Sequence, residues 1–277
     1  MTIAALIVTS SSERWIEQTL SSVLRQDRPA DYVLVVDDNS TDSTRSIARG
    51  LLGDRGRVVQ ALTTARDITT RVADNFRQGL AACADADVVV LGDHDDIWHA
   101  DRIARQAGIL DSSPEAIMVA SDGRLVDDNG AALGGTLRTA FPVPARWAQA
   151  TPGERMRIAL RWSLATGGAS AVRPIPLAQQ GIPAGWLHDR WWSLAATAME
   201  AFVLDDAQVI DYRVSPEQQV GLARGQQAKS TPTRAWNAIR QAPRTAARIN
   251  DVQRLRAVAT EATVAELSGA RLLRNFA

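Results

Sequence analysis

The sequence predicts an α/β fold: a Rossmann-like, mostly parallel sheet with helices on both faces. Three observations support this prediction. Short apolar runs alternate with helical patterns through the first half of the chain, the runs have the length of buried strands, and three of them end in polar or acidic clusters. The carboxyl ends of parallel strands meet at one edge of such a sheet, where ligands bind. We therefore expect the ligand site at this edge.

The first half of the chain supplies the regular part of the pattern. Residues 3–8 are continuously apolar and lead into Thr9-Ser10-Ser11-Ser12, a polar turn that is typical of a helix cap. A helix over residues 13–25 is expected because apolar residues recur there at helical spacing: Trp15, Ile16, Leu20, Val23 and Leu24. The next elements alternate as strand 32–36, helix 43–52, strand 57–62, helix 71–84 and strand 88–91.

The second half is less regular. We expect a strand at 116–120, a helix at 155–164, a glycine-rich turn into a strand at 166–172, a helix from within 184–192 to about residue 201, and a strand at 209–213. After Gly221 the pattern is helical, with interruptions at Pro232 and Pro243.

Composition places the chain among ordinary globular proteins. Its 277 residues are 45% hydrophobic and 22% charged, which excludes intrinsic disorder, and the balance of 31 basic and 31 acidic side chains argues against a histone-like partner of nucleic acid. The balance hides an asymmetry, because residues 222–277 hold ten basic and three acidic residues (+7) and residues 1–221 carry −7. The single cysteine, Cys83, excludes an internal disulfide and a multi-cysteine zinc site. Without a signal peptide or an apolar stretch near ~20 residues, we expect a soluble, cytoplasmic protein.

An acidic cluster follows the strand at 88–91. Asp93-His94-Asp95-Asp96 brings three carboxylates within four residues, which repel one another unless a cation or solvent neutralises them. Oxygen ligands on a loop suit Mg²⁺ or Mn²⁺ shared with substrate phosphates. The alternative is a solvated acidic turn.

Weaker candidates lie at other predicted element ends. Asp38 follows strand 32–36 and could accept a hydrogen bond from a nucleobase imide or a ribose hydroxyl, although Asp37 and Asp42 would equally suit a helix cap. His188-Asp189 begins a predicted helix, whose N-terminus would keep the carboxylate ionised and able to take a proton.

Together these motifs resemble the inverting nucleotide-sugar glycosyltransferases of family 2. The resemblance rests on residues 35–42, on residues 93–98 with Asp101-Arg102, and on the later stretches 165–169, 188–192 and 211–221. It covers about residues 3–221, and the later stretches resemble a bacterial branch that includes rhamnosyltransferases of cell-surface polysaccharide assembly. It implies the GT-A fold, with a nucleotide-sugar-binding half at about 1–100, an acceptor-side half at 101–221 and a basic helical extension at 222–277.

The resemblance implies roles on the donor side of the site. Thr9 and Asp38 would hold the nucleobase and Asp93 the nucleoside. Asp95, with Asp96, would bind the Mg²⁺ or Mn²⁺ ion that bridges the diphosphate. The donor would be dTDP-rhamnose or a UDP-sugar.

The resemblance also assigns the acceptor side. Asp189 corresponds to the catalytic base that deprotonates a hydroxyl of a glycan or lipid-linked acceptor. His188 and Trp191 are candidate acceptor contacts, although Trp191 stands at a helical position that equally suits packing.

Two arginines are further candidates for the donor side, independently of the resemblance. Arg66 and Arg71 would face the donor diphosphate, unless they belong to a solvated helix face.

The sequence departs from the family pattern in two places. Ser11 and Ser12 stand where the family usually has an aromatic residue and an asparagine that cover the nucleobase, so base stacking is not expected. Ser215 stands where the family often has a histidine near the diphosphate and metal. Ser215 or Glu217 would have to replace it, or the metal dependence is weaker.

Other functions and partners are compatible with the sequence. A nucleotidyltransferase shares the sheet and the paired acids, but residues 9–12 lack the glycine and lysine of its phosphate loop. A glycosyltransferase-like binding protein without activity is supported only by the missing histidine. Residues 222–277 would pack on the domain or on a second subunit, or would contact anionic lipid at the inner face of the cell membrane.

Overall fold

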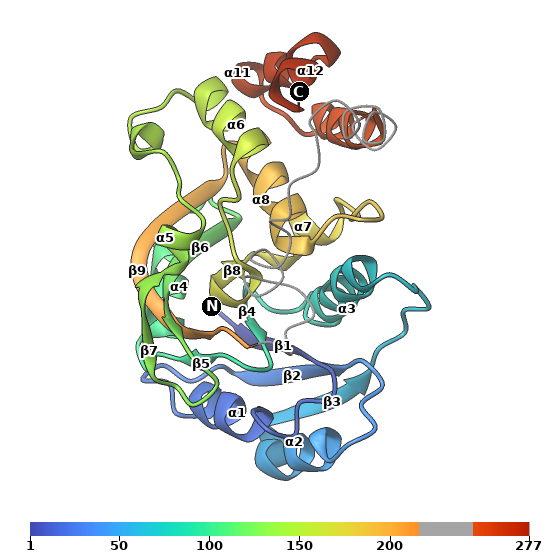
Figure 1. Cartoon of the computed structure of the whole chain (residues 1–277), viewed down its shortest axis with the longest axis vertical. Coiled ribbons are helices and arrows are strands. Elements are labelled where there is room, and N and C mark those ends of the chain that lie inside the picture. The colour runs from blue at the N-terminus through green and yellow to red at the C-terminus, as the bar shows by residue number, and fades with distance from the viewer. Residues whose placement is uncertain (216–245, 277) are drawn as a thin grey trace.

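The computed structural model describes residues 1–215 and 246–276, and within these ranges nine strands form one sheet (Figure 1). Their order is β3-β2-β1-β4-β8-β6-β9-β5, and β7 pairs with β6. The bounds are β1 (Ile3–Thr9), β2 (Tyr32–Asp37), β3 (Gly56–Gln60), β4 (Val88–Asp93), β5 (Ile97–Trp98), β6 (Met118–Val126), β7 (Ala132–Thr136), β8 (Ser170–Val172) and β9 (Phe202–Arg213).

Strands β3, β2, β1 and β4 are parallel, so their carboxyl ends lie at one edge, as predicted. The sheet then changes direction, because β8 runs antiparallel to both β4 and β6. Strands β6 and β9 are again parallel to each other. The predicted fold class, a mostly parallel sheet with helices, is confirmed, and the direction change falls beside β4, the strand that leads into the acidic loop.

Alternation along the strands sends side chains into two hydrophobic cores. In β1, Leu6 and Val8 pack on one face and Ala5 and Ile7 on the other, as the two-residue period of a strand requires. The first face is covered by α3 (Ile68–Ala82), α6 (Pro152–Arg161), α7 (Pro174–Ala178) and α8 (His188–Ala198). The second is covered by α1 (Ile16–Leu24), α2 (Thr44–Leu52), α4 (Arg102–Ser112) and the short α5 (Leu137–Ala140).

Several elements differ from the sequence-based expectation: β5, β7, α5 and α7 were not expected, and α4 and β9 are the most informative differences. Helix α4 was not expected, although Ile103, Ala107 and Leu110 stand at helical spacing and are fully buried. Strand β9 begins at Phe202 rather than near residue 209, so it includes a carboxylate that reads as a loop residue. That carboxylate, Asp205, is paired with Arg105 at 2.6 Å, which removes the cost of placing its charge in a strand.

The described part of the predicted C-terminal extension packs on the domain (Figure 1). Ile249, Val252 and Leu255 are buried in the same core as α6 and α8. Beyond them, α11 (Glu261–Val264) and α12 (Gly269–Phe276) lie over α6, where buried Glu266 pairs with Arg157 at 2.9 Å. This arrangement agrees with packing on the domain, one of the three alternatives that the sequence left open.

The carbonyl of Ala198 ties the same segment to the end of α8. It accepts hydrogen bonds from the Thr260 amide at 3.0 Å and from the Thr263 hydroxyl at 2.6 Å. The predicted interruptions at Pro232 and Pro243 lie outside the described residues. Among the helices that are described, none is long and apolar enough to cross a bilayer.

Candidate active site

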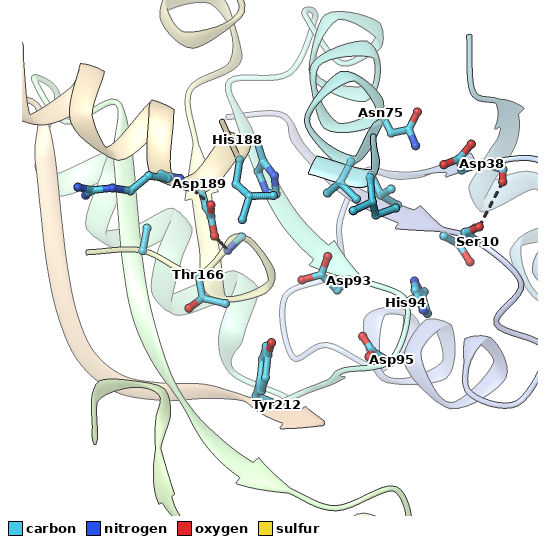
Figure 2. A pocket seen from close by; sticks show the side chains of 18 of the residues that line it. Ser10, Asp38, Asn75, Asp93, His94, Asp95, Thr166, His188, Asp189 and Tyr212 are labelled. Carbon is cyan, nitrogen blue, oxygen red and sulfur yellow. Dashed lines mark hydrogen bonds between the residues drawn. The ribbon is translucent and has the colours of Figure 1, made fainter. Parts of the chain in front are cut away.

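A cavity of about 510 Å³ lies at the carboxyl edge of β1, β2 and β4. In Figure 2, Ser10 and Asp38 lie at one end, the acidic loop 93–95 lies in the middle, and Asp189 lies near the other end. The side walls come from α3 and from the first turn of α8. The cavity therefore brings the three polar strand ends and the His188-Asp189 motif into one place.

The acidic loop divides its carboxylates between the cavity and the interior. Asp93 and Asp95 line the cavity, whereas Asp96 is buried behind them and accepts the backbone N–H of Arg213 at 3.1 Å. Burial, together with the charges of Asp95 and Asp189, raises the pKa of Asp93 to about 7. Burial and the neighbouring carboxylates likewise raise the pKa of Asp96 well above its ordinary value. The accumulated negative charge is unfavourable without a cation.

Two buried arginines support this loop. The Arg213 Nε–H donates to the carbonyl of Asp95 at 2.9 Å and fixes the loop backbone. Arg102 stacks on the Trp98 ring at 3.9 Å and donates to the carbonyl of Leu91 at 2.6 Å. Burial lowers the pKa of Arg102 to about 9, and the nearby Asp96 and Asp93 carboxylates oppose that shift. Arg102 thus places a fixed positive charge beneath the acidic loop.

Gly168 leaves room for two of the carboxylates. A Cβ atom at this position would lie 2.6 Å from Asp96 Oδ2 and 2.8 Å from Asp93 Oδ2. Asp96 Oδ2 is buried and has no hydrogen-bond partner in the part of the chain that the structure describes. The glycine therefore forms a small cradle in which a buried, unpaired oxygen lies beside a carboxylate that faces the cavity.

Replacing Gly168 by alanine is expected to lower the free energy of unfolding by about 1–3 kcal/mol, because both carboxylates must move away from the added methyl group. Urea unfolding would measure the change. The control is Gly108→Ala in α4, where an added Cβ meets nothing within 4 Å and helix propensity favours alanine. Equal stabilities of Gly168→Ala and the unsubstituted protein would contradict the close approach of the Asp93 and Asp96 carboxylates to Gly168.

Asp189 lies in the first turn of α8 and faces the cavity (Figure 2). Its Oδ1 accepts the Arg190 N–H at 2.6 Å, and its Oδ2 accepts the Gly167 N–H at 3.1 Å. Burial raises the pKa of Asp189 to about 6, although these hydrogen bonds act in the opposite direction. A carboxylate that is held in position and titrates near neutrality has the properties of a general base.

His188 lines the cavity beside Asp189 as a neutral ring. It stacks on Phe76 with ring centroids 3.7 Å apart, and burial lowers its pKa to about 3. Neither ring nitrogen has a hydrogen-bond partner among the described residues. A substrate hydroxyl is a chemically suitable partner for either nitrogen.

The residues predicted to hold the nucleobase lie together but already have partners. Thr9 and Asp38 both line the cavity. The Thr9 hydroxyl shares a hydrogen bond with the Ser12 hydroxyl at 2.5 Å, and Asp38 Oδ2 accepts from Arg71 at 2.7 Å. Arg71 therefore meets the site through Asp38 and is not itself in the wall of the cavity.

Three other positions singled out in the sequence are not among the residues that line the cavity. Arg66 is exposed and is not part of the wall. Trp191 is 1% exposed, packs edge-on against Trp186 and belongs to the hydrophobic core, as the packing interpretation predicted. Ser215 is buried, and Glu217 lies outside the described residues.

Sequence reasoning missed several residues that the structure brings to the site, among them Arg102, Gly168, Arg213 and Asn75. Arg102 and Gly168 belong to the stretches on which the family resemblance rests, but only the fold shows what these two residues contact. Asn75 lines the cavity from α3, and both polar atoms of its amide lack partners among the described residues. Leaving a buried polar group unpaired costs about 1–3 kcal/mol, so such an amide calls for an explanation.

The donor atoms present fit a hard divalent cation. Within residues 1–215 and 246–276 there is no group of three or more His, Cys, Asp or Glu side chains arranged to hold a metal ion. Mg²⁺ and Mn²⁺, however, commonly take one or two carboxylates and complete their coordination with substrate phosphates and water. Asp93 and Asp95 at the cavity supply that number, and the unpaired Asp96 oxygen lies behind them.

Comparison with known proteins identifies the family and the fold. The family model described as Glycosyl transferase family 2 matches residues 5–164. Glucosyl-3-phosphoglycerate synthase from Mycobacterium tuberculosis, solved with UDP, is similar with a TM-score of 0.55 and 22% identity over 81% of this chain and 76% of that chain. TarS 1-349 from S. aureus, solved with UDP-GlcNAc, gives a TM-score of 0.58 and 17% identity over 100% of this chain and 73% of that chain. No curated protein sequence matches this chain.

Proposed function

The chain belongs to glycosyl transferase family 2, and from this premise we propose that it transfers a sugar, with inversion, from a nucleoside diphosphate to a hydroxyl of a glycan or lipid-linked acceptor. One observation carries the proposal. Asp189, a carboxylate with a raised pKa, faces the same cavity as the acidic loop with Asp93 and Asp95. A base and a cation site on two sides of one cavity are what a single displacement needs.

In the proposed reaction, Asp189 accepts the proton of the acceptor hydroxyl. The acceptor oxygen then forms a bond to the anomeric carbon while the bond from that carbon to the diphosphate oxygen breaks. The electron pair leaves with the nucleoside diphosphate, and attack from the opposite face inverts the configuration. The two backbone hydrogen bonds from Gly167 and Arg190 hold the carboxylate in position for this transfer.

Asp95, with Asp93 or Asp96 beside it, would hold the divalent cation in this proposal. The bound Mg²⁺ or Mn²⁺ supplies positive charge for the departing diphosphate. The UDP and UDP-GlcNAc held by the two similar structures support a UDP-sugar as donor, and dTDP-rhamnose is the second candidate. Contact of residues 222–277 with anionic lipid, or with a second subunit, stays a prediction.

The pH profile follows from the raised pKa of Asp189. Only the ionised carboxylate accepts a proton, so with a pKa of about 6 we expect kcat/KM to fall about tenfold for each pH unit below 6 and to level off above 7. Initial rates of nucleotide release at saturating Mn²⁺, measured from pH 5 to 8, would give the profile. A rate that is constant between pH 5 and 7 would contradict the assignment of Asp189.

A thermal-shift panel tests the donor class. We expect UDP or dTDP with Mn²⁺ to raise the unfolding temperature, since a ligand at 100 times its Kd stabilises a protein by about 2.7 kcal/mol. Without Mn²⁺ the shift should be much smaller, because the acidic loop then faces the diphosphate uncompensated. The control is GDP under the same conditions. Equal shifts with all three nucleotides, or none with any, would contradict the proposed donor.

A catalytically impaired binding protein is the second candidate function, and the observation that favours it is Ser215 in the place of the family's histidine. It predicts the same thermal shifts but no nucleotide release from any donor sugar. Membership of a glycosyltransferase family argues against the nucleotidyltransferase hypothesis.

A further inference from the structure

Arg190 stands in the first turn of α8, but its guanidinium bonds to the end of another helix. It donates to the carbonyls of Ala159 at 2.5 Å, Leu160 at 2.8 Å and Trp162 at 2.6 Å. These carbonyls belong to the last turn of α6 and to the residue after it, where a helix has no amide partners of its own to offer and carries partial negative charge. Arg190 therefore attaches the start of α8 to the end of α6.

The residue before it, Asp189, holds the other end of the same connection. The chain leaves α6 at Trp162 and reaches Gly167, and we call residues 162–167 the wall segment. The Trp162 carbonyl at its start accepts from Arg190, and the Gly167 N–H at its end donates to Asp189 at 3.1 Å. Figure 2 shows Thr166 and Asp189 at the same end of the cavity. Four residues of the wall segment line the cavity: Ser163, Ala165, Thr166 and Gly167.

Arg190 also brings a positive charge to Asp189 without occupying its oxygens, which accept backbone N–H groups instead. Burial raises the pKa of Asp189, and the Arg190 charge, like those backbone hydrogen bonds, opposes the rise. Burial lowers the pKa of Arg190 itself to about 10, so the guanidinium stays charged at neutral pH. Of the other groups around this pair, Asp93 at the end of β4 is acidic, Arg248 from the C-terminal segment is basic, and His188 is neutral.

We propose that Arg190 is a positioning residue for the catalytic base: it fixes the wall segment to the first turn of α8 and keeps a positive charge beside the Asp189 carboxylate. In the described ranges no side chain donates to that carboxylate, so its remaining lone pairs are open to the acceptor proton. Arg190 itself acts only through Asp189 and the wall segment. The inference rests on the proposed function, since it takes Asp189 to be the base.

Arg190→Lys and Arg190→Gln test the charge. Both side chains keep a donor for the α6 carbonyls, but only lysine keeps the charge. The titration of Asp189 is followed in the full chain by carbon NMR of its carboxyl group, assigned from the signal that Asp189→Asn loses. In Arg190→Gln the midpoint should rise by about 0.5–1 pH unit, because loss of a nearby positive charge disfavours the ionised carboxylate. In Arg190→Lys it should stay at about pH 6.

Amide hydrogen exchange tests the attachment of the wall segment. In Arg190→Gln the amides of residues 163–167 should exchange at least about 10-fold faster than in the unsubstituted protein, and in Arg190→Lys about threefold faster. With Mn²⁺ and a UDP-sugar, kcat of Arg190→Gln should fall about 10-fold while KM for the donor changes by less than about threefold, because the base is misplaced but the donor site is intact.

Arg173 provides the matched control. It is half-buried like Arg190, and its guanidinium donates to the carbonyls of Leu110 at 2.8 Å, near the end of α4, and of Ala116 at 3.0 Å. It is not among the residues that line the cavity. Arg173→Gln therefore removes the same kind of contact elsewhere, and it should leave both the Asp189 midpoint and the exchange of the wall segment unchanged.

Three outcomes would overturn the inference: the same Asp189 midpoint in Arg190→Lys and Arg190→Gln, unchanged exchange of the wall segment in Arg190→Gln, or equal changes in Arg173→Gln. If Arg190→Gln does not fold, Arg190→Lys decides, because a raised midpoint or unchanged exchange in that variant also refutes the proposal. Full activity of Asp189→Asn would instead refute the proposed function. An inactive Asp189→Asn without these effects of Arg190 refutes this inference alone.

Discussion

Sugar transfer is expected to fall by about 10³-fold when Asp189 is replaced by asparagine, because the amide cannot accept the acceptor proton. Asparagine keeps the shape of the side chain, and Gly167 can still donate a hydrogen bond to its oxygen. The affinity for the donor nucleotide should therefore change by less than about threefold. Nucleotide release from sugar donors that carry the nucleotide identified in the thermal-shift panel, together with calorimetric titration of that nucleotide, measures both quantities.

The stability of Asp189→Asn provides an internal control. The pKa of about 6 in the folded protein lies above the ordinary value of the carboxyl group, so proton binding favours the folded state. This contribution is present below about pH 4 and is lost as the pH rises through 6. The neutral variant should thus not lose stability from charge at pH 7.5. Asp206→Asn, an exposed change in β9, should leave activity unchanged. Full activity of Asp189→Asn would refute the base assignment.

Replacing Asp95 by asparagine is expected to lower transfer by about 10²–10³-fold and to remove the Mn²⁺-dependent part of the thermal shift with nucleotide. The substitution removes one negative charge from the cavity wall and leaves the size of the side chain nearly unchanged. Higher Mn²⁺ concentrations should restore part of the activity, because a weaker site fills at higher metal concentration. Rates and thermal shifts over a Mn²⁺ series measure both effects.

A nearby aspartate serves as the matched control for this change. Asp101 is exposed, lies six residues from Asp95 and precedes α4 without a side-chain capping hydrogen bond. Asp101→Asn should preserve the metal response. If Asp95→Asn keeps the same Mn²⁺ dependence as the unsubstituted protein, the cation is held elsewhere and the role of Asp95 is wrong.

The fold was largely predictable because its strands are continuous apolar runs. Strand β1 was expected over 3–8 and spans Ile3–Thr9, and β2 was expected over 32–36 and spans Tyr32–Asp37. Elements that depend on a distant partner were not predicted correctly. The N-terminal half of β9 contains the buried Asp205, whose charge is compensated by Arg105, a hundred residues away, and by a hydrogen bond from Ser121.

The part of the candidate site that lies at strand ends was also predictable, because the apolar runs in the sequence locate those ends. Residues at strand ends, such as Asp38 and Asp93, must meet at one edge of a parallel sheet, so their neighbourhood follows from the topology. Asn75 could not be found in this way, because one polar residue on a helix gains meaning only when the helix orientation buries it. The contact of Arg213 with the acidic loop likewise depends on the pairing of β9 with β5, which joins segments more than a hundred residues apart.

The attachment of the C-terminal segment to the end of α8 affects how truncations should be interpreted. Ile249, Val252 and Leu255 complete the core that α8 shares, and the Ala198 carbonyl at the end of α8 accepts the hydrogen bonds of Thr260 and Thr263. Cutting the chain after residue 221 would uncover an apolar surface on the very helix whose first turn presents Asp189. A shortened protein that failed to sediment with vesicles, or that lost activity, would therefore report damage to the folded unit. Charge-reversing substitutions on exposed arginines such as Arg254 and Arg256 would probe membrane attachment without that confusion.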